Sequence, residues 1–195
     1  MKIRNTLIAT AALLGISTAA MARDFETFEL DTQVSYGNFS GEYRKVINSD
    51  YDHIEVGYSP IKGLTASFRY VEDGGDTEYR TRLTYTLVNN FHGFYLKPRI
   101  EYRVFEHDAD YFRFRPIIGY GYRLNEGVRV FAEFTPQFCS GGGYGAFNFC
   151  KTKSEVGVNV KLIDQVSVTP FIRMDTDDRF GDRNAIAGTK ISISL

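Results

Sequence analysis

Residues 94–138 read FYLKPRIEYRVFEHDADYFRFRPIIGYGYRLNEGVRVFAEFTPQF, and this stretch decides the fold. Three runs in it, Phe94–Phe105, Phe112–Arg123 and Val128–Phe138, alternate between apolar and largely polar residues. Side chains on a strand point to opposite faces in turn, so each run has one apolar and one polar face. No Asp, Glu, Lys or Arg falls on the apolar faces, although these residues make up 24% of the chain. This sorting predicts strands of a transmembrane β-barrel, with an apolar outside and a polar lumen.

The same alternation extends along the chain and predicts an all-β, antiparallel up-and-down barrel of about ten strands. The expected strands are Glu26–Tyr36, Tyr51–Tyr58, Leu64–Val71, Glu78–Val88, the three central runs, Lys151–Leu162, Val166–Asp175 and a last strand that ends at Ile191–Leu195. Gly37–Asp50 is expected to be a loop. Short turns alternate with longer, more acidic loops, which is typical of the periplasmic and external ends of outer-membrane barrels. An even strand count places both termini in the periplasm. The alternative fold is a secreted β-sandwich, whose polar face would meet water.

The N-terminus predicts a secretory signal peptide over residues 1–22. Lys2 and Arg4 form a basic region, Leu7–Ile16 is a short apolar core, and Ala20–Ala22 is a small-residue cleavage site. The apolar core is too short for a spanning helix. We therefore expect a barrel domain over residues 23–195 in the bacterial outer membrane. Its expected partners are outer-membrane lipid, lipopolysaccharide and small anionic solutes; a monomer is expected, with no nucleic acid, metal or cofactor.

The predicted inward positions carry more cations than anions, with fourteen Lys or Arg against eight Asp or Glu. A wall of one sign enriches counter-ions, and arginine matches planar or tetrahedral oxyanions. The residues predicted to line a pore are Arg80, Arg82, Lys97, Arg99, Arg103, Arg113, Arg115, Arg129 and Arg173. The first hypothesis is a narrow channel for small anions. The alternative is a non-conducting barrel, structural or loop-binding, because side chains fill the interior of small barrels.

The two cysteines, Cys139 and Cys150, enclose a glycine-rich segment. An even cysteine count in an exported chain predicts a disulfide that closes this short loop. Neither a Cys-x-x-Cys pair nor a nearby histidine indicates a redox or metal site.

No catalytic residues are predicted, and we expect no enzyme. A barrel hydrolase needs a nucleophile, a base and an orienting group on one rim. None of the three histidines, His53, His92 and His107, has a serine two residues further on. His53 and Glu55 share the inward face and leave a weak acid–base pair open.

The central stretch resembles the oligogalacturonate-specific porin family, which includes small acidic-sugar porins of bacterial outer membranes. The resemblance rests on Leu96-Lys97-Pro98-Arg99, Phe112-Arg113-Phe114-Arg115-Pro116 and Val130-Phe131-Ala132-Glu133-Phe134-Thr135-Pro136, with a weaker match at Val168-Thr169-Pro170-Phe171. These segments cover roughly a quarter of the chain. The resemblance implies a twelve-stranded barrel that passes acidic oligosaccharides along Lys97, Arg99, Arg113 and Arg115. The chain departs from the family in the ten strands counted here and in its last residue, Leu195, where an aromatic residue is usual.

Overall fold

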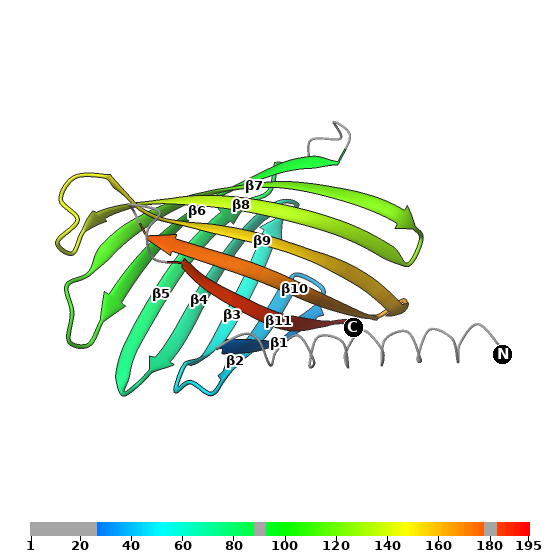
Figure 1. The fold of residues 1–195 in the computed structure, drawn as a ribbon, viewed down its shortest axis with the longest axis horizontal. Coiled ribbons are helices and arrows are strands. Elements are labelled where there is room, and N and C mark those ends of the chain that lie inside the picture. Colours follow the sequence, from blue (N-terminus) through cyan, green and yellow to red (C-terminus); the bar gives the residue numbers. More distant parts are fainter. Residues whose placement is uncertain (1–26, 88–92, 178–182) are drawn as a thin grey trace.

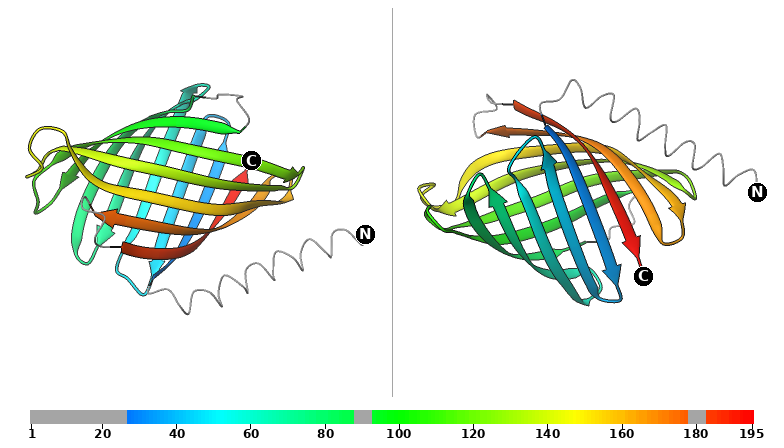
Figure 2. Two further views of the ribbon diagram at one scale, coloured as in Figure 1. Left: turned by 45° about the horizontal axis from the view of Figure 1, so that its top comes forward. Right: turned by 90° about the horizontal axis from the view of Figure 1, so that it is seen from below.

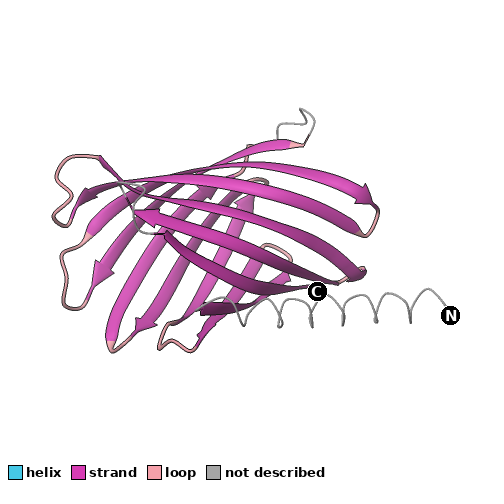
Figure 3. Cartoon of the chain, viewed as in Figure 1, coloured by secondary structure: helices cyan, strands magenta, loops and turns pink. Residues whose placement is uncertain are grey.

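The chain folds into a closed barrel of eleven strands in a computed structural model that describes residues 27–87, 93–177 and 183–195 (Figure 1). The strands are β1 (Thr27–Tyr36), β2 (Phe39–Ile47), β3 (Asp52–Ile61), β4 (Leu64–Asp73), β5 (Asp76–Tyr85), β6 (Phe94–Phe105), β7 (Tyr111–Asn125), β8 (Val128–Gly141), β9 (Asn148–Ile163), β10 (Val166–Asp177) and β11 (Arg183–Ser194). Figure 3 shows strands joined by loops and turns throughout the described residues. Over these residues, no helix is long and apolar enough to span a membrane. The predicted signal peptide, residues 1–22, lies outside them.

Each strand pairs antiparallel with the next one, and β1 closes the barrel by pairing parallel with β11, from Thr27↔Ile186 to Ser35↔Ser194. Figure 2 shows the blue β1 beside the red β11, running in the same direction. After ten reversals of direction, the eleventh strand necessarily runs the same way as the first. The start of β1 and the end of β11 therefore lie at opposite ends of the barrel. The predicted even strand count is wrong by one strand, and the placement of both termini on one side no longer follows from it.

The strand that the sequence analysis missed is β2, which occupies most of the segment expected to be a loop. Its outward parity includes Gly41 and Lys45, which interrupt the apolar alternation of Phe39, Tyr43 and Ile47. β2 is also the shortest strand, with 9 residues, so few positions carry the pattern. Backbone pairing with β1 and β3 on both sides supplies the stability that local pattern lacks.

The barrel is apolar outside and charged inside. On β6, Ile100 on the outward parity is 53% exposed, whereas its neighbour Glu101 is 0% exposed. Fifteen polar or charged residues are buried among the described residues, against eight apolar ones. Soluble domains bury mainly apolar side chains, so this distribution is reversed. It confirms the predicted facing of the central strands.

The two ends of the barrel differ in their connections. One end, here called the loop end, carries residues 48–51, 74–75, 106–110 and 142–147. The other, the turn end, carries the two-residue turns 37–38, 62–63, 126–127 and 164–165, and the end of β11. Segments 88–92 and 178–182 lie outside the described residues, and the first of them includes His92. The predicted separation of short turns from longer loops holds for most of the described connections. The connection at 74–75 is shorter than expected.

A disulfide joins β8 to β9 at the loop end, as predicted. The Cys139 and Cys150 sulfurs are 2.07 Å apart and enclose the loop at 142–147. In that loop Gly142, Gly143 and Gly145 have φ of 55°, 87° and 71°. Such angles are unfavourable for other residues, so glycine is required there. The disulfide therefore restricts the conformations of a glycine-rich loop whose backbone would otherwise be very flexible.

Removing the disulfide is expected to lower the free energy of unfolding by somewhat less than about 3 kcal/mol, because the cross-link restricts a short loop in the unfolded chain. Urea unfolding of the Cys139→Ser, Cys150→Ser double variant, compared with the oxidised protein, measures this loss. As a control, adding a reductant should leave the double variant unchanged. Equal unfolding midpoints for the oxidised protein and the variant would contradict the expectation.

Candidate functional site

The nine residues predicted to line a pore all face the interior, where two hollows lie. The loop-end cavity, about 420 Å³, is lined by Arg80, Arg103, Arg113 and Arg173 among others. The turn-end cavity, about 470 Å³, is lined by Lys97, Arg99 and Arg129 among others. Arg82 and Arg115 line both. The structure thus brings the nine cations to one interior surface, while their action on a solute stays a prediction.

Five basic side chains separate the two cavities, since each of them lines both. This central layer consists of Arg44, Arg69, Arg82, Arg115 and Lys153. Its members come from β2, β4, β5, β7 and β9. The layer therefore draws on strands from around most of the barrel and narrows the lumen between the two hollows.

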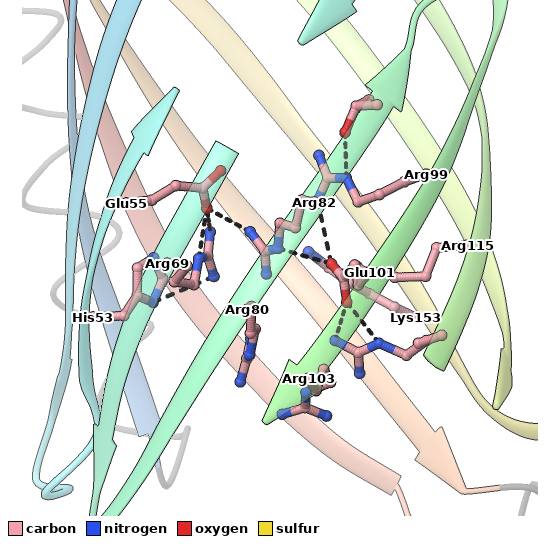
Figure 4. Close-up of polar contacts among 12 residues, drawn as sticks. His53, Glu55, Arg69, Arg80, Arg82, Arg99, Glu101, Arg103, Arg115 and Lys153 are labelled. Atoms are coloured by element: carbon pink, nitrogen blue, oxygen red, sulfur yellow. Dashed lines mark hydrogen bonds and ion pairs between the residues drawn. The ribbon is translucent and has the colours of Figure 1, made fainter. Parts of the chain in front are cut away.

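Glu101 on β6 is the anion at the centre of one half of this layer (Figure 4). Arg82 Nε lies 2.9 Å from its Oε1, and Arg115 Nη1 lies 3.0 Å from the same oxygen. Arg113 donates to Oε2 through Nε at 2.7 Å and through Nη2 at 2.5 Å. Strand register explains the convergence, because Glu101 lies opposite Arg82 on β5 and opposite Arg113 on β7. One carboxylate thus holds three guanidinium groups from two neighbouring strands within 3.0 Å, while Arg99 Nη1 on its own strand lies 4.0 Å from Oε1.

In the other half of the layer, Arg69 forms ion pairs with two carboxylates. Its Nη2 lies 2.8 Å from Glu42 Oε1 and 2.5 Å from Glu55 Oε2. Arg82 Nη1 also reaches Glu55 Oε2, at 2.5 Å. Because Arg82 bonds both Glu55 and Glu101, it links the two halves into one network (Figure 4).

His53 is fully buried in this network and hydrogen-bonds Glu42, whose Oε1 lies 2.9 Å from Nε2. Its Nδ1 lies 3.4 Å from Arg69 Nη1, and a guanidinium can only donate. Nδ1 is therefore the acceptor, and the proton on Nε2 is donated to Glu42. The acid–base pair left open between His53 and Glu55 is replaced by a fixed hydrogen bond to Glu42.

Glu42, His53 and Glu55 offer ligand atoms within 4.8 Å of one another. That spacing would suit a metal ion. Arg69, however, already binds both carboxylates and places its positive charge between them. The trio therefore acts as an acceptor for arginine in this arrangement.

A third group of ion pairs lies beside the parallel pairing of β1 with β11. Arg173 on β10 donates through Nη1 to Glu29 Oε2 on β1 at 2.6 Å, across the intervening β11. Arg44 Nη2 on β2 lies 2.8 Å from Asp31 Oδ2 and its Nη1 lies 3.3 Å from Glu29. Both carboxylates are buried. These ion pairs join β1 to β2 on one side and, across β11, to β10 on the other.

Sequence reasoning missed several interior residues. Glu42 and Arg44 were overlooked because β2 was taken for a loop. Lys151 was left out of the predicted cations although it shares the parity of Lys153 and lines the loop-end cavity. The period-two spacing of Ser40, Glu42, Arg44 and Val46 was the available signal for β2.

Both cavities carry positive charge, and the loop-end cavity carries more. Ten Lys or Arg and three Asp or Glu line the loop-end cavity. Nine Lys or Arg and five Asp or Glu line the turn-end cavity. Walls of one sign within a low-dielectric barrel concentrate counter-ions. The lumen is therefore suited to attract anions.

The fold and site define a closed β-barrel with an apolar outside and a cationic interior. No protein-family model matches the chain, and no curated protein sequence matches it either.

Proposed function

We propose that this chain is a bacterial outer-membrane β-barrel, exported by the signal at residues 1–22, that lets small anionic solutes through a narrow cationic lumen. The proposal rests on one observation: apolar side chains lie on the outside of the barrel and charged ones are buried inside, the reverse of a soluble protein. A soluble barrel would place Ile100 and Phe112, which are 53% and 55% exposed, in water and would bury Glu101. In lipid the same arrangement is favourable, because apolar side chains face hydrocarbon and charges face the lumen.

Acidic oligosaccharides are the solutes that the resemblance to oligogalacturonate-specific porins favours. Of the residues it implies, Lys97 and Arg99 line the turn-end cavity, Arg113 lines the loop-end cavity and Arg115 lines both. A negatively charged oligosaccharide could bind these cations one after another and so pass through the central layer. The proposal involves no bond breaking and assigns no catalytic residue.

The second candidate function is a non-conducting barrel that stabilises the envelope or binds a partner through its loops. The central layer favours it. Arg82 is 3% exposed and Glu101 is 0% exposed, so this part of the lumen is filled by paired side chains. Small barrels are commonly closed in this way.

Single-channel recording in planar lipid bilayers separates the two candidates. With a potassium chloride gradient, we expect a reversal potential of the sign that marks chloride preference. Replacing Arg129 by Glu is expected to shift this potential towards cation preference, because Arg129 lines the turn-end cavity and none of its contacts within the described residues is an ion pair.

The control is Lys62→Glu, a charge change in the turn between β3 and β4, outside both cavities. It should leave the reversal potential unchanged. A silent bilayer after verified insertion would favour the non-conducting barrel. Cation preference of the unmodified protein would contradict an anion channel.

A further inference from the structure

The wall formed by β5, β6 and β7 holds more buried positive charge than its carboxylates neutralise. Glu78 on β5 is bonded by both Arg80 and Arg103. Three guanidinium groups lie within 3.0 Å of Glu101 on β6, and a fourth, of Arg99, lies 4.0 Å away; of the three, only Arg82 has a further carboxylate, Glu55. The five guanidinium groups closest to Glu78 and Glu101 belong to Arg80, Arg82, Arg103, Arg113 and Arg115. All five line the loop-end cavity.

Lys151 on β9 adds another cation to the same cavity. Among the described residues, no ion pair or side-chain hydrogen bond engages its ammonium group. Its register partner on β8 is Gln137, which is 2% exposed and whose Oε1 has no hydrogen-bond partner there. Unpartnered polar atoms in a buried position are costly. The loop-end cavity thus contains an ammonium group without an ion pair among the described residues, beside an unsatisfied amide, although the carboxylate of Asp175 also lines the cavity.

The turn-end cavity is better balanced. Lys97 Nζ lies 3.2 Å from Glu133 Oε1, and Lys153 Nζ lies 2.7 Å from Glu155 Oε2. The carboxylates therefore match the lysines of that cavity nearly one for one. The surplus of positive charge is therefore larger at the loop end.

We infer that the loop-end cavity binds a compact oxyanion with at least two negative charges, of the phosphate or sulfate class, held by Lys151, Arg113 and Arg103. Burying unpaired charges is unfavourable, and a multivalent anion between them offsets that cost. Glu101 takes Nε and Nη2 of Arg113, so Nη1 is the donor that Arg113 can offer the anion. Arg103 is bonded to Glu78 and Tyr111 and contributes its positive charge. A cavity of about 420 Å³ leaves room for the anion with bound water.

Calorimetric titration of the full chain in detergent at low ionic strength tests the site, with pyrophosphate as the probe. We expect saturable binding by the unmodified protein. Lys151→Gln is expected to weaken it about tenfold, because one charge-assisted hydrogen bond is lost. Lys151 has no protein partner to lose within the described residues, so the variant should fold. The matched control is Lys97→Gln in the turn-end cavity, which should change the affinity by less than about twofold because the screened effect of a distant charge is small.

The anion could come from solution or from a lipid headgroup, and phosphatidic acid in mixed micelles provides the second arm. Binding of pyrophosphate that depends on Lys151 supports a soluble ligand. Binding of phosphatidic acid alone, with the same dependence, supports a headgroup in the same site. Absence of binding in both arms, or equal weakening by Lys151→Gln and Lys97→Gln, overturns the inference. The inference rests on the closed barrel and needs no solute passage, so a silent bilayer would leave this result untouched.

Discussion

Replacing Glu101 by Gln is expected to lower the free energy of unfolding by about 3 to 5 kcal/mol, the usual cost of breaking a buried ion pair from one side. Glu101 is 0% exposed and is the shared partner of Arg82, Arg113 and Arg115. The amide keeps the shape of the carboxylate but removes its charge. Three guanidinium groups would then repel one another inside the barrel. Urea unfolding of the barrel folded in lipid vesicles measures the loss.

Glu133→Gln is the matched control for this experiment. Glu133 also faces the lumen, but its side chain is 20% exposed, and it pairs with a single lysine, Lys97, that is 32% exposed. Solvent screens such a pair, so a loss of no more than about 1 kcal/mol is expected. Equal losses for the two variants would show that Glu101 is not the centre of the network.

Ile100→Arg is expected to lower the stability of the lipid-embedded barrel by about 2 to 4 kcal/mol, the cost of a charge on the lipid face near the bilayer midplane. Ile100 lies midway along β6, between Leu83 on β5 and Phe114 on β7, and is 53% exposed. Its side chain points away from the lumen. Reversible urea unfolding in phosphatidylcholine vesicles compares the variant with the unmodified protein.

Tyr122→Arg tests whether depth in the bilayer is the cause. Tyr122 is also outward-facing, at 55% exposure, but lies near the turn end of β7. At the membrane interface the same charge costs about 0 to 1 kcal/mol. A small cost at both positions would mean that the outer surface faces water, which contradicts the proposed membrane location.

The alternation within Phe94–Phe138 was sufficient to predict three strands, their facing and a polar interior. Such predictions succeed because side-chain facing is a property of a single extended strand. The disulfide was equally predictable, since two cysteines in one chain leave one intramolecular pairing. β2 was missed because a lysine and a glycine on its outer face weaken the local pattern, while pairing with both neighbours stabilises it.

The number of strands and the pairing within the lumen could be known only from the tertiary structure. Parallel closure of β1 on β11 depends on how the whole sheet curves back on itself, which no single strand encodes. Outside β2, the sequence by itself determined which face of each strand points inward and that cations outnumber anions there. Only the closed barrel decided that Glu101 forms close ion pairs with Arg82, Arg113 and Arg115. It also decided that Lys151 has no ion-pair partner among the described residues. Register and curvature bring residues from distant strands within a few ångströms, and these are properties of the assembled sheet.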